Sequence, residues 1–323
     1  MRRALPFLWI LGILGLIAFA PAQASAQTYP SGPVTIIVPY PPGGQIDALA
    51  RMMQQKLQPI LGQPVVVENK PGAGGNIGTA YAMRAAPDGH TIVLTTDGVM
   101  VVAPHVFANL GFDPTLATPI TIASETMVGI AVNQSIPAKN IPELIAYAKA
   151  NPGKVTYAAP GLPQHIVAEL IKKRGDADIQ YVPYKGGAPA LSDLMGGHIQ
   201  AVAITVPSIL PHLSTGSLRV IAVSGKERFP QLPDVQTISE TYPGIEHISW
   251  TGFFAPPGTP KHIIDTLNAA LTKSMKEPDV AEKLARNAEK VIATDAAYAS
   301  SLVKSDLAKW GEYLKQVKIN VER

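Results

Sequence analysis

Hydrophobic positions along the chain follow two periods: short runs typical of buried strands, and a spacing of three or four typical of amphipathic helices. Val34–Val38 is a β-branched run, and after a turn rich in proline and glycine, apolar residues recur at helical spacing from Ile46 to Ile60. The order of strand, glycine loop and helix then repeats at Val65–Glu68, Pro71–Asn76 and Ile77–Ala86, before a third strand at Thr91–Thr95. Alternating strands and helices predict an α/β fold with a mostly parallel sheet.

A second series of such units follows the segment Thr121–Val132. Asn140 is expected to cap a helix, because Pro142 lies in its first turn and Glu143 stands three residues after the cap. We expect strands at Val155–Ala158, Ile179–Val182 and Ala201–Thr205, and helices at Gln164–Lys173, Pro189–Met195 and Pro207–Leu213.

The last third of the chain is expected to be mainly helical. After the apolar run Ile248–Ala255, Thr259 is the expected cap of a helix that has Pro260 at its first position. Two further helices are expected near Val280–Ala288 and at Ala296–Lys315.

The amino terminus has the pattern of a secretory signal peptide. Arg2 and Arg3 precede an apolar run from Ala4 to Ala20, and Ala24-Ser25-Ala26 supplies a small-residue cleavage site. We expect residues 1–26 to be removed on export to the periplasm. A retained membrane anchor is the alternative, because the apolar run could almost span a bilayer.

Composition narrows the class of protein further. The chain has no cysteine, which excludes disulfides, thiolate metal sites and a lipid anchor on a modified cysteine. Cleavage would leave about 297 of the 323 residues, enough for two domains. Without Arg2 and Arg3 the chain carries 25 basic and 24 acidic side chains, so nucleic acid and anionic membranes are poor partners. We expect a soluble monomer without a metal or cofactor.

The predicted topology indicates which loops could bind a ligand. In an open α/β sheet, ligands bind beyond the carboxyl ends of the strands, where helix amino termini offer unpaired N–H groups. Six loops meet this condition: Tyr40–Asp47, Pro71–Asn76, Thr95–Gly98, Ala158–Gln164, Pro183–Ala188 and Thr205–Ser208. In the first, Gly43 and Gly44 precede a helix and would let a carboxylate approach main-chain donors. An ordinary strand-to-helix turn has the same spacing, and both interpretations stay open.

Signatures of an enzyme or of a nucleotide site are missing from the sequence. The loop Gly72–Gly78 places its final glycine one position too late for G-x-G-x-x-G, and no G-x-S-x-G, H-E-x-x-H or phosphate-loop pattern occurs. A structural hydrogen bond is the expected role of His165, and a serine, a histidine and an aspartate that meet only in space remain an alternative. Surface or capping roles are expected for the other histidines, His90, His105, His198, His212, His247 and His262.

Seven ordered motifs run through nearly the whole mature chain: Tyr29-Pro30, Pro42-Gly43-Gly44 with Asp47, Leu61–Asn69, Pro71–Gly78, Ala86–Gly89, Val182–Gly186 and Ala255–Pro260. Together they resemble the tripartite tricarboxylate transporter receptors, also called the Bug family of periplasmic solute-binding proteins. The resemblance implies a type II periplasmic-binding fold, with two α/β lobes and a ligand cleft between them. Residues 27–125 and about 225–323 would form lobe 1, and residues from about 126 to 224 would form lobe 2.

The resemblance also implies the chemistry of the site. One small organic carboxylate would be held without an arginine clamp, by backbone donors, hydroxyls and ordered water. Lobe 1 would contribute Tyr40, Pro42, Gly43, Gly44, Gln45, Ile46, Asp47, Asn76 and Thr95. Lobe 2 would contribute Ala159, Gly161, Gln164, Tyr184, Lys185, Gly186 and Thr205. The implied role is delivery to the membrane subunits of a tripartite transporter. A ligand-sensing subunit and a periplasmic enzyme on the same fold are the alternatives.

The sequence departs from the family pattern in three of these loops, at Gln45-Ile46, Ala159–Pro163 and Thr205-Val206. Apolar residues stand there where hydroxyl and amide groups are usual: Ile46, Pro160, Leu162 and Val206. We therefore expect a ligand with a larger apolar body, such as an aromatic or longer aliphatic acid. The alternative is that these side chains pack inside their own lobes.

Overall fold

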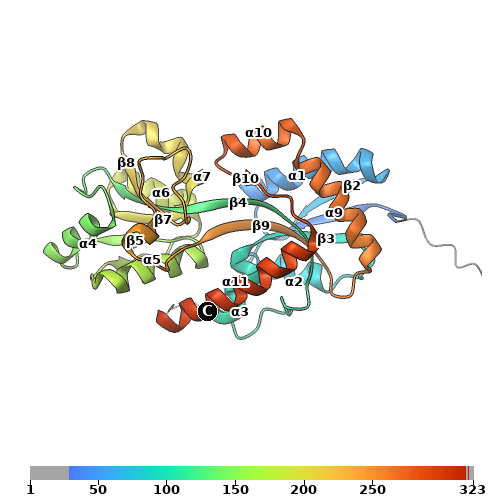
Figure 1. Cartoon of the computed structure of the whole chain (residues 1–323), viewed down its shortest axis with the longest axis horizontal. Helices are drawn as coiled ribbons and strands as arrows, with labels where there is room; N and C mark the ends of the chain where they lie inside the picture. Colours follow the sequence, from blue (N-terminus) through green and yellow to red (C-terminus); the bar gives the residue numbers. More distant parts are fainter. Residues whose placement is uncertain (1–28, 318, 320–323) are drawn as a thin grey trace, which may run out of the picture.

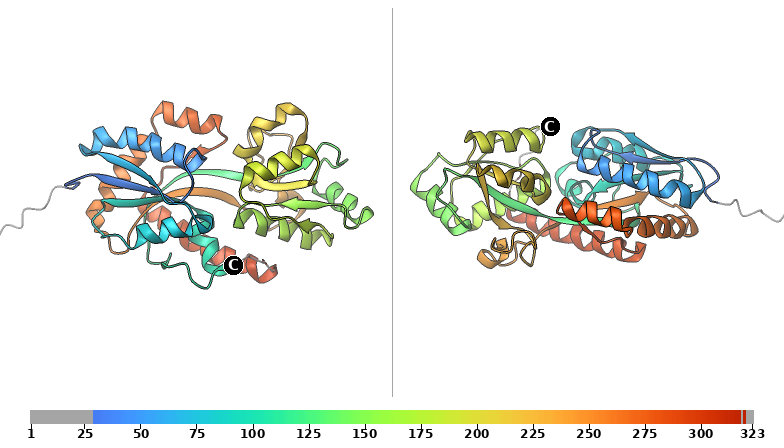
Figure 2. Two further views of the ribbon diagram at one scale, coloured as in Figure 1. Left: turned by 180° about the vertical axis from the view of Figure 1, so that it is seen from behind. Right: turned by 90° about the horizontal axis from the view of Figure 1, so that it is seen from above.

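Two α/β lobes lie side by side along the long axis of the molecule, and two strands cross between them (Figures 1 and 2). The computed structural model describes residues 29–317 and 319, so the expected signal peptide lies outside the described residues. The crossing strands are β4 (Thr118–Asn133) and β9 (Ile248–Ala255), which pair antiparallel. This arrangement confirms the two-lobed α/β fold expected from the sequence.

Lobe 1 is built on three parallel strands, β1 (Val34–Val38), β2 (Val65–Asn69) and β3 (Thr91–Thr96). Helix α1 (Gln45–Leu61) covers them, because its apolar residues recur at helical spacing and pack in one cluster with β1. The other elements of lobe 1 are η1 (Ala73–Gly75), α2 (Asn76–Met83), η2 (Gly98–Val102), α3 (Ala103–Val106), α9 (Lys261–Met275), α10 (Pro278–Arg286), β10 (Lys290–Val291) and α11 (Ala296–Gln316).

Lobe 2 is built on the parallel strands β7 (Ala201–Thr205), β5 (Thr156–Ala158) and β6 (Gln180–Tyr181), with β8 (Leu218–Val223) antiparallel to β4. Its helices are α4 (Ile141–Ala150), α5 (Leu162–Gly175), α6 (Gly187–Gly196), α7 (Val206–Ile209), η3 (Leu210–Thr215) and α8 (Ile238–Thr241). The predicted cap of α4 is confirmed, since Glu143 N–H donates to Asn140 Oδ1 at 2.9 Å.

The strand directions bring the carboxyl ends of both sets of strands to the junction between the lobes. Strand β4 runs in the same direction as β3, because both are antiparallel to β9, and it continues into lobe 2. Strand β7 is antiparallel to β4 and therefore runs back toward lobe 1, with β5 and β6 parallel to it. The end of β3 lies level with Ser124, and the end of β7 lies level with Val128. Loops after both sets of strands consequently face one stretch of β4.

Several sequence-based expectations need correction. Parallel pairing is confined to strands within each lobe. The crossing strands β4 and β9 are antiparallel to each other, β4 is antiparallel to β7, and β9 is antiparallel to β3. The helix expected at Pro207–Leu213 is divided into α7 and η3, consistent with Pro211, which lacks an N–H at that point. Thr259 does not cap α9; its hydroxyl donates to Pro256 O, and Pro260 is the cap position. Strand β8 and helix α8 were not anticipated.

The segment 224–247 joins β8 to β9 and packs mainly on lobe 2. Val223 pairs with Thr237, and helix α8 packs against α4. The segment also contacts lobe 1, where Gln231 Nε2 donates to Ala285 O at 2.9 Å. On these contacts we propose that lobe 2 ends near residue 247, beyond the expected boundary near 224.

Helix α11 connects the two lobes along one side of the molecule (Figure 1). It packs against η2 and β4, and also against α5 of lobe 2. At its end, Lys173 Nζ donates to Gln316 O at 2.6 Å. Within the part of the chain that the structure describes, neither α11 nor any other helix is long and apolar enough to cross a membrane.

Candidate ligand-binding site

The loop before α1 presents a helix amino terminus with no side chain over it. Gly43 has φ +86°, a conformation that favours glycine, and Gly44 is the cap residue of α1 with no side-chain hydrogen bond to the helix. Both glycines and Pro42 are exposed. The first N–H groups of α1 are therefore open to an anionic group in front of the helix.

Asp47 holds this loop in place from beneath. Its Oδ2 accepts from Gly43 N–H and from Arg51 Nε, each at 2.9 Å, and its Oδ1 accepts from Asn69 Nδ2 at 2.9 Å. Asn69 Nδ2 also donates to Tyr40 O at 3.1 Å. The hydrogen bond from Arg51 is the main cause that lowers the pKa of Asp47 to about 2. The carboxylate predicted to contact ligand thus orients the loop that would do so.

Replacing Asp47 with asparagine is expected to lower the free energy of unfolding by about 2 kcal/mol at pH 7. Because the pKa is lower in the folded state, the carboxylate stabilises the fold above about pH 4, and this stabilisation is lost as the pH falls toward 2. Urea unfolding at pH 7 and pH 3 measures the effect, and the difference from wild type should fall to about half at pH 3. Asp178→Asn, at an exposed position, is the control. A difference independent of pH would contradict this role.

The loop before α2 turns sharply on glycines. Gly72, Gly74 and Gly75 all have positive φ. A Cβ on Gly75 would lie 2.9 Å from Val99 Cγ2 and 3.0 Å from the Tyr40 hydroxyl, so glycine is needed for this close approach. Asn76, the first residue of α2, is 8% exposed, and its Oδ1 has no hydrogen-bond partner among the described residues. This amide needs a partner from outside the described protein atoms.

Tyr40 connects the first loop to the end of β3. Its hydroxyl lies 2.8 Å from Thr96 Oγ1, and burial raises the pKa of Tyr40 to about 12, so the phenol is neutral at pH 7. Thr95 is fully buried and its Oγ1 lies 3.3 Å from Thr79 Oγ1. The structure therefore brings Tyr40, Gly75, Thr95 and Thr96 together, because the Tyr40 hydroxyl interacts with the side chains of both threonines.

The predicted loops of lobe 2 also contain helices that begin after a glycine. Gly161 and Gly186 are the cap residues of α5 and α6, and neither helix has a side-chain cap. The Gln164 Oε1 atom lies against Gly161, is buried, and has no hydrogen-bond partner among the described residues. Each lobe thus holds one buried amide oxygen of this kind beside a glycine-led helix start.

Other predicted residues of lobe 2 have partners within their own lobe. The Tyr184 hydroxyl donates to Asp193 Oδ2 at 2.6 Å, and this bond raises the pKa of Tyr184 to about 12. Thr205 Oγ1 lies 3.1 Å from Ser208 Oγ, and Ala159 is buried in the core. Lys185 is exposed, and its position next to Gly186 makes it the cation nearest the start of α6 in the chain.

The two lobes meet at one end of the site. A Cβ on Gly98 of η2 would lie 3.3 Å from Pro163 Cδ of α5, so these elements are in close contact. On the other side, Ala288 of lobe 1 packs in one cluster with Val206 of lobe 2. The six predicted loops are therefore grouped around the junction that the strand directions define.

Two buried polar groups at this junction were missed. Glu289 is 5% exposed and accepts from Ser124 Oγ at 2.8 Å, and Ser124 Oγ lies 2.9 Å from Thr251 Oγ1. Burial raises the pKa of Glu289, which also hydrogen-bonds Gln45. The second group contains His247, which is buried beside Asp97, so the expected surface role of this histidine is wrong. These contacts join residues far apart in sequence, and no local pattern indicates them.

The apolar residues that suggested a large ligand pack within the lobes. Val206 is fully buried, while Ile46 and Leu162 are partly buried against the hydrophobic clusters. Packing therefore accounts for these three residues without a ligand. His165 stacks on Tyr181 with ring centroids 3.9 Å apart, and burial lowers its pKa, which agrees with a structural role.

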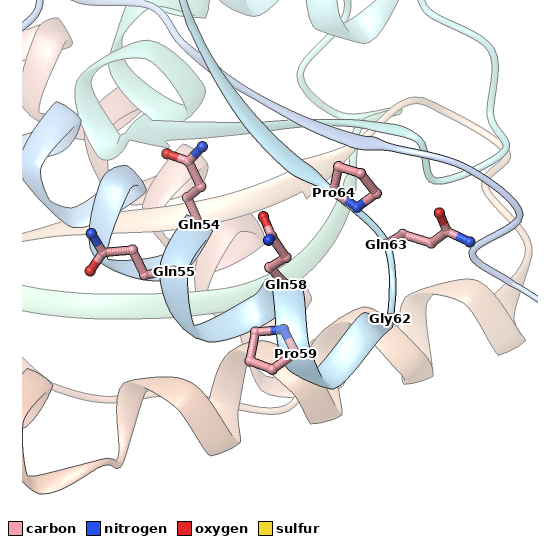
Figure 3. A pocket seen from close by; sticks show the side chains of 7 residues that line it. All are labelled: Gln54, Gln55, Gln58, Pro59, Gly62, Gln63 and Pro64. Atoms are coloured by element: carbon pink, nitrogen blue, oxygen red, sulfur yellow. The ribbon is translucent and has the colours of Figure 1, made fainter.

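A hollow of about 740 Å³ lies elsewhere, at the carboxyl end of α1 (Figure 3). It is lined by Gln54, Gln55, Gln58, Pro59, Gly62, Gln63 and Pro64. The carbonyl end of a helix disfavours an anion, and at 1.5 Å per residue this end lies roughly 20 Å from the amino terminus of α1. The hollow is therefore a poor carboxylate site despite its size.

Comparisons with known proteins agree with the fold described above. BugT from Bordetella pertussis is 34% identical over 318 residues, covering 95% of this chain and 96% of that protein. A Rhodopseudomonas palustris protein solved with adipate has a TM-score of 0.81 and 31% identity, covering 89% of this chain and 98% of that one. MatC from the same organism, solved with bound malate, has a TM-score of 0.79 and 29% identity, covering 88% and 100%. The model of the tripartite tricarboxylate transporter family receptor matches residues 49–319. The resemblance seen in the sequence is confirmed, and the chain belongs to this family of receptors.

Proposed function

We propose that the protein binds a small organic carboxylate between its lobes and delivers it to the membrane subunits of a tripartite transporter. We place it in the periplasm as a monomer, after removal of residues 1–26. Relatives solved with adipate and with malate make aliphatic dicarboxylates the first candidates.

One observation carries this proposal. The helices α1, α2, α5 and α6 begin after a glycine without a side-chain cap: Gly44, Gly75, Gly161 and Gly186. Away from the junction, α4, α8 and α11 are capped by the side chains of Asn140, Thr237 and Asp295. Helices α9 and α10 also lack a side-chain cap, but they begin after Pro260 and Glu277. Each of these four helices of the predicted loops begins at a glycine, so the cap residue places no side chain over the first N–H groups.

Two of these helix starts belong to each lobe, which favours a ligand with a carboxylate at each end. Each carboxylate could then accept N–H groups from one lobe, aided by the partial positive charge of the helix terminus. Asn76 and Gln164 stand on opposite lobes, and water can bridge their buried amides to a carboxylate. Binding by both lobes would draw them together about β4 and β9.

A thermal-shift panel tests the proposal on protein exported to the periplasm, whose intact mass should correspond to a chain beginning at Gln27. We expect adipate or malate, at 100 times the dissociation constant, to add about 2.7 kcal/mol and raise the melting temperature by about 5 °C. Citrate, glutamate, nicotinate and terephthalate complete the panel. Adipamide, which has the same carbon chain as adipate without the charges, is the matched control and should give no shift.

The outcomes separate the parts of the proposal. A shift with adipamide equal to that with adipate would show that carboxylates are not what the site recognises. No shift with any acid would contradict the ligand class. If an acid binds, loss of its uptake on deletion of the gene tests delivery to a transporter rather than sensing.

A further inference from the structure

A buried contact between an aspartate and a histidine lies where the binding loop after β3 meets the segment that leads into β9. His247 Nε2 lies 3.1 Å from Asp97 Oδ2 and 2.9 Å from Ser249 Oγ. The His247 side chain is fully buried and packs edge-on against Trp310, with ring centroids 4.9 Å apart. Asp97 is 4% exposed. Solvent therefore has almost no access to the pair.

The main chain of His247 is fixed to lobe 2. Its N–H donates to Ser224 O at 2.7 Å, and its carbonyl accepts from the Ser224 hydroxyl. Ser224 in turn bonds to Val128 of β4 in both directions, at 2.9 Å each. Through Ser224, the main chain of His247 is therefore hydrogen-bonded to the end of β8 and connected to β4 where that strand enters lobe 2.

Asp97 belongs to the ligand-binding edge of lobe 1. It follows Thr95 and Thr96 directly and precedes Gly98, the residue that contacts α5. Thr96 is hydrogen-bonded to Tyr40, which lines the approach to Gly75. A displacement of Asp97 would therefore be transmitted to the residues around the start of α2.

We infer that Asp97 and His247 are positioning residues that couple the binding loop of lobe 1 to the hinge and so set how the lobes close. The inference rests on the proposed binding function, because closure on a carboxylate is the event that the pair controls. Neither residue needs to touch the ligand.

The polar character of the pair argues against a role in stability alone. Burying polar side chains is costly unless they are hydrogen-bonded, and apolar residues of similar volume often stabilise a core as well or better. Asp97 Oδ2, His247 Nδ1 and Trp310 Nε1 all lack a hydrogen-bond partner among the described residues, so Asp97 Oδ2 and His247 Nε2 are in close contact without the geometry of a hydrogen bond. Polar side chains in buried contact can specify one relative placement of two segments, and here they join a binding loop to a hinge.

Three variants test the coupling. His247→Phe keeps an aromatic ring but removes its polar nitrogens. Asp97→Asn replaces the carboxyl group with an amide of similar shape, and His247→Gln keeps a polar side chain. The melting temperature, the radius of gyration from small-angle scattering without ligand, and the dissociation constant for adipate are measured for each. We expect Asp97→Asn and His247→Phe to enlarge the ligand-free radius and weaken adipate binding about 5- to 150-fold. His247→Gln should stay within about threefold of wild type.

Asp306→Asn is the matched control. Asp306 lies on α11, is buried like Asp97 with 5% exposed, and accepts from Trp250 Nε1 on β9 at 2.8 Å, so it is a buried carboxylate with a different partner. It should lower the melting temperature while the radius and the affinity stay unchanged. The coupling is refuted if His247→Phe keeps the wild-type radius and affinity, or if Asp306→Asn reproduces the effects of Asp97→Asn. The scattering measurement needs no ligand, so it decides the matter even if the wild type binds none of the acids.

Discussion

Replacing Gly44 with arginine is expected to abolish binding of adipate, with a dissociation constant raised roughly 100-fold or more, while the protein stays folded. Gly44 is exposed, and its φ of −78° and ψ of 172° are open to any residue. A Cβ there would meet only Pro41 O, at 3.8 Å. The arginine side chain would fit the fold but fill the space before α1, where a carboxylate is proposed to meet N–H groups.

Two companion variants separate bulk from charge. Gly44→Ala adds only a Cβ and should keep adipate affinity within a few-fold of wild type. Gly44→Glu fills the same space with a negatively charged side chain and should also abolish binding. Unlike arginine, glutamate cannot attract the carboxylate of the ligand, so this variant tests the effect of bulk without a new ion pair. Calorimetric titration measures affinity, and urea unfolding checks the fold. Wild-type affinity in the folded arginine and glutamate variants would remove this loop from the site.

The parts of the fold that could be predicted from sequence are those with local causes. The segment Ile248–Ala255, singled out from the sequence, has the bounds of β9, although Ser249, Thr251 and Gly252 interrupt its apolar residues. The cap at Asn140 followed from spacing alone. Strand β8 was missed although Leu218–Val223 is apolar, since Arg219 interrupts a run that follows directly on η3.

The site was predicted as a set of loops, and its long-range contacts were not. Glycines at helix starts are visible in sequence, so Gly44, Gly161 and Gly186 could be named before the structure. The pairing of Asp97 with His247 joins residues 150 positions apart and depends on how β9 returns through the sheet. No periodicity or spacing encodes such a contact, because it is created by the tertiary fold.

Asp47 shows an intermediate case. Its placement in a glycine loop suggested contact with the ligand, yet the Asp47–Arg51 spacing of four residues is that of an ion pair on one helix face. That local signal indicates a structural partner for the carboxylate. Asp47 was placed in the binding loop from the sequence, and in the structure its carboxylate accepts a hydrogen bond from Gly43 N–H of that loop. Asp47 therefore supports the loop.

Gly78→Ala is expected to destabilise the protein by about 3 kcal/mol, although alanine is the better helix former. Gly78 lies in α2, where the helix crosses the ends of β1 and β2 so closely that a Cβ would overlap the Lys70 carbonyl oxygen and lie 2.8 Å from Pro39 Cα. Both contacts are backbone atoms, so no side chain can turn aside. Relief would require α2 to move, and the start of α2 carries Asn76 and the Gly75 contact with Tyr40. Adipate affinity should therefore fall together with stability.

Gly311→Ala provides the matched comparison for Gly78→Ala, because Gly311 also lies inside a helix, α11. The nearest atoms to a Cβ at Gly311 would be those of the His105 ring, at 3.3 Å; this exposed side chain is hydrogen-bonded to Leu307 O at 2.9 Å and needs to yield by only a few tenths of an ångström. Helix propensity then dominates, and the substitution should stabilise the protein by up to about 1 kcal/mol without changing affinity. Urea unfolding of both variants measures the opposite signs. Equal free energies of unfolding for the two variants would show that α2 can move away from β1 at little cost. In that case the close packing at Gly78 does not determine the position of the start of α2.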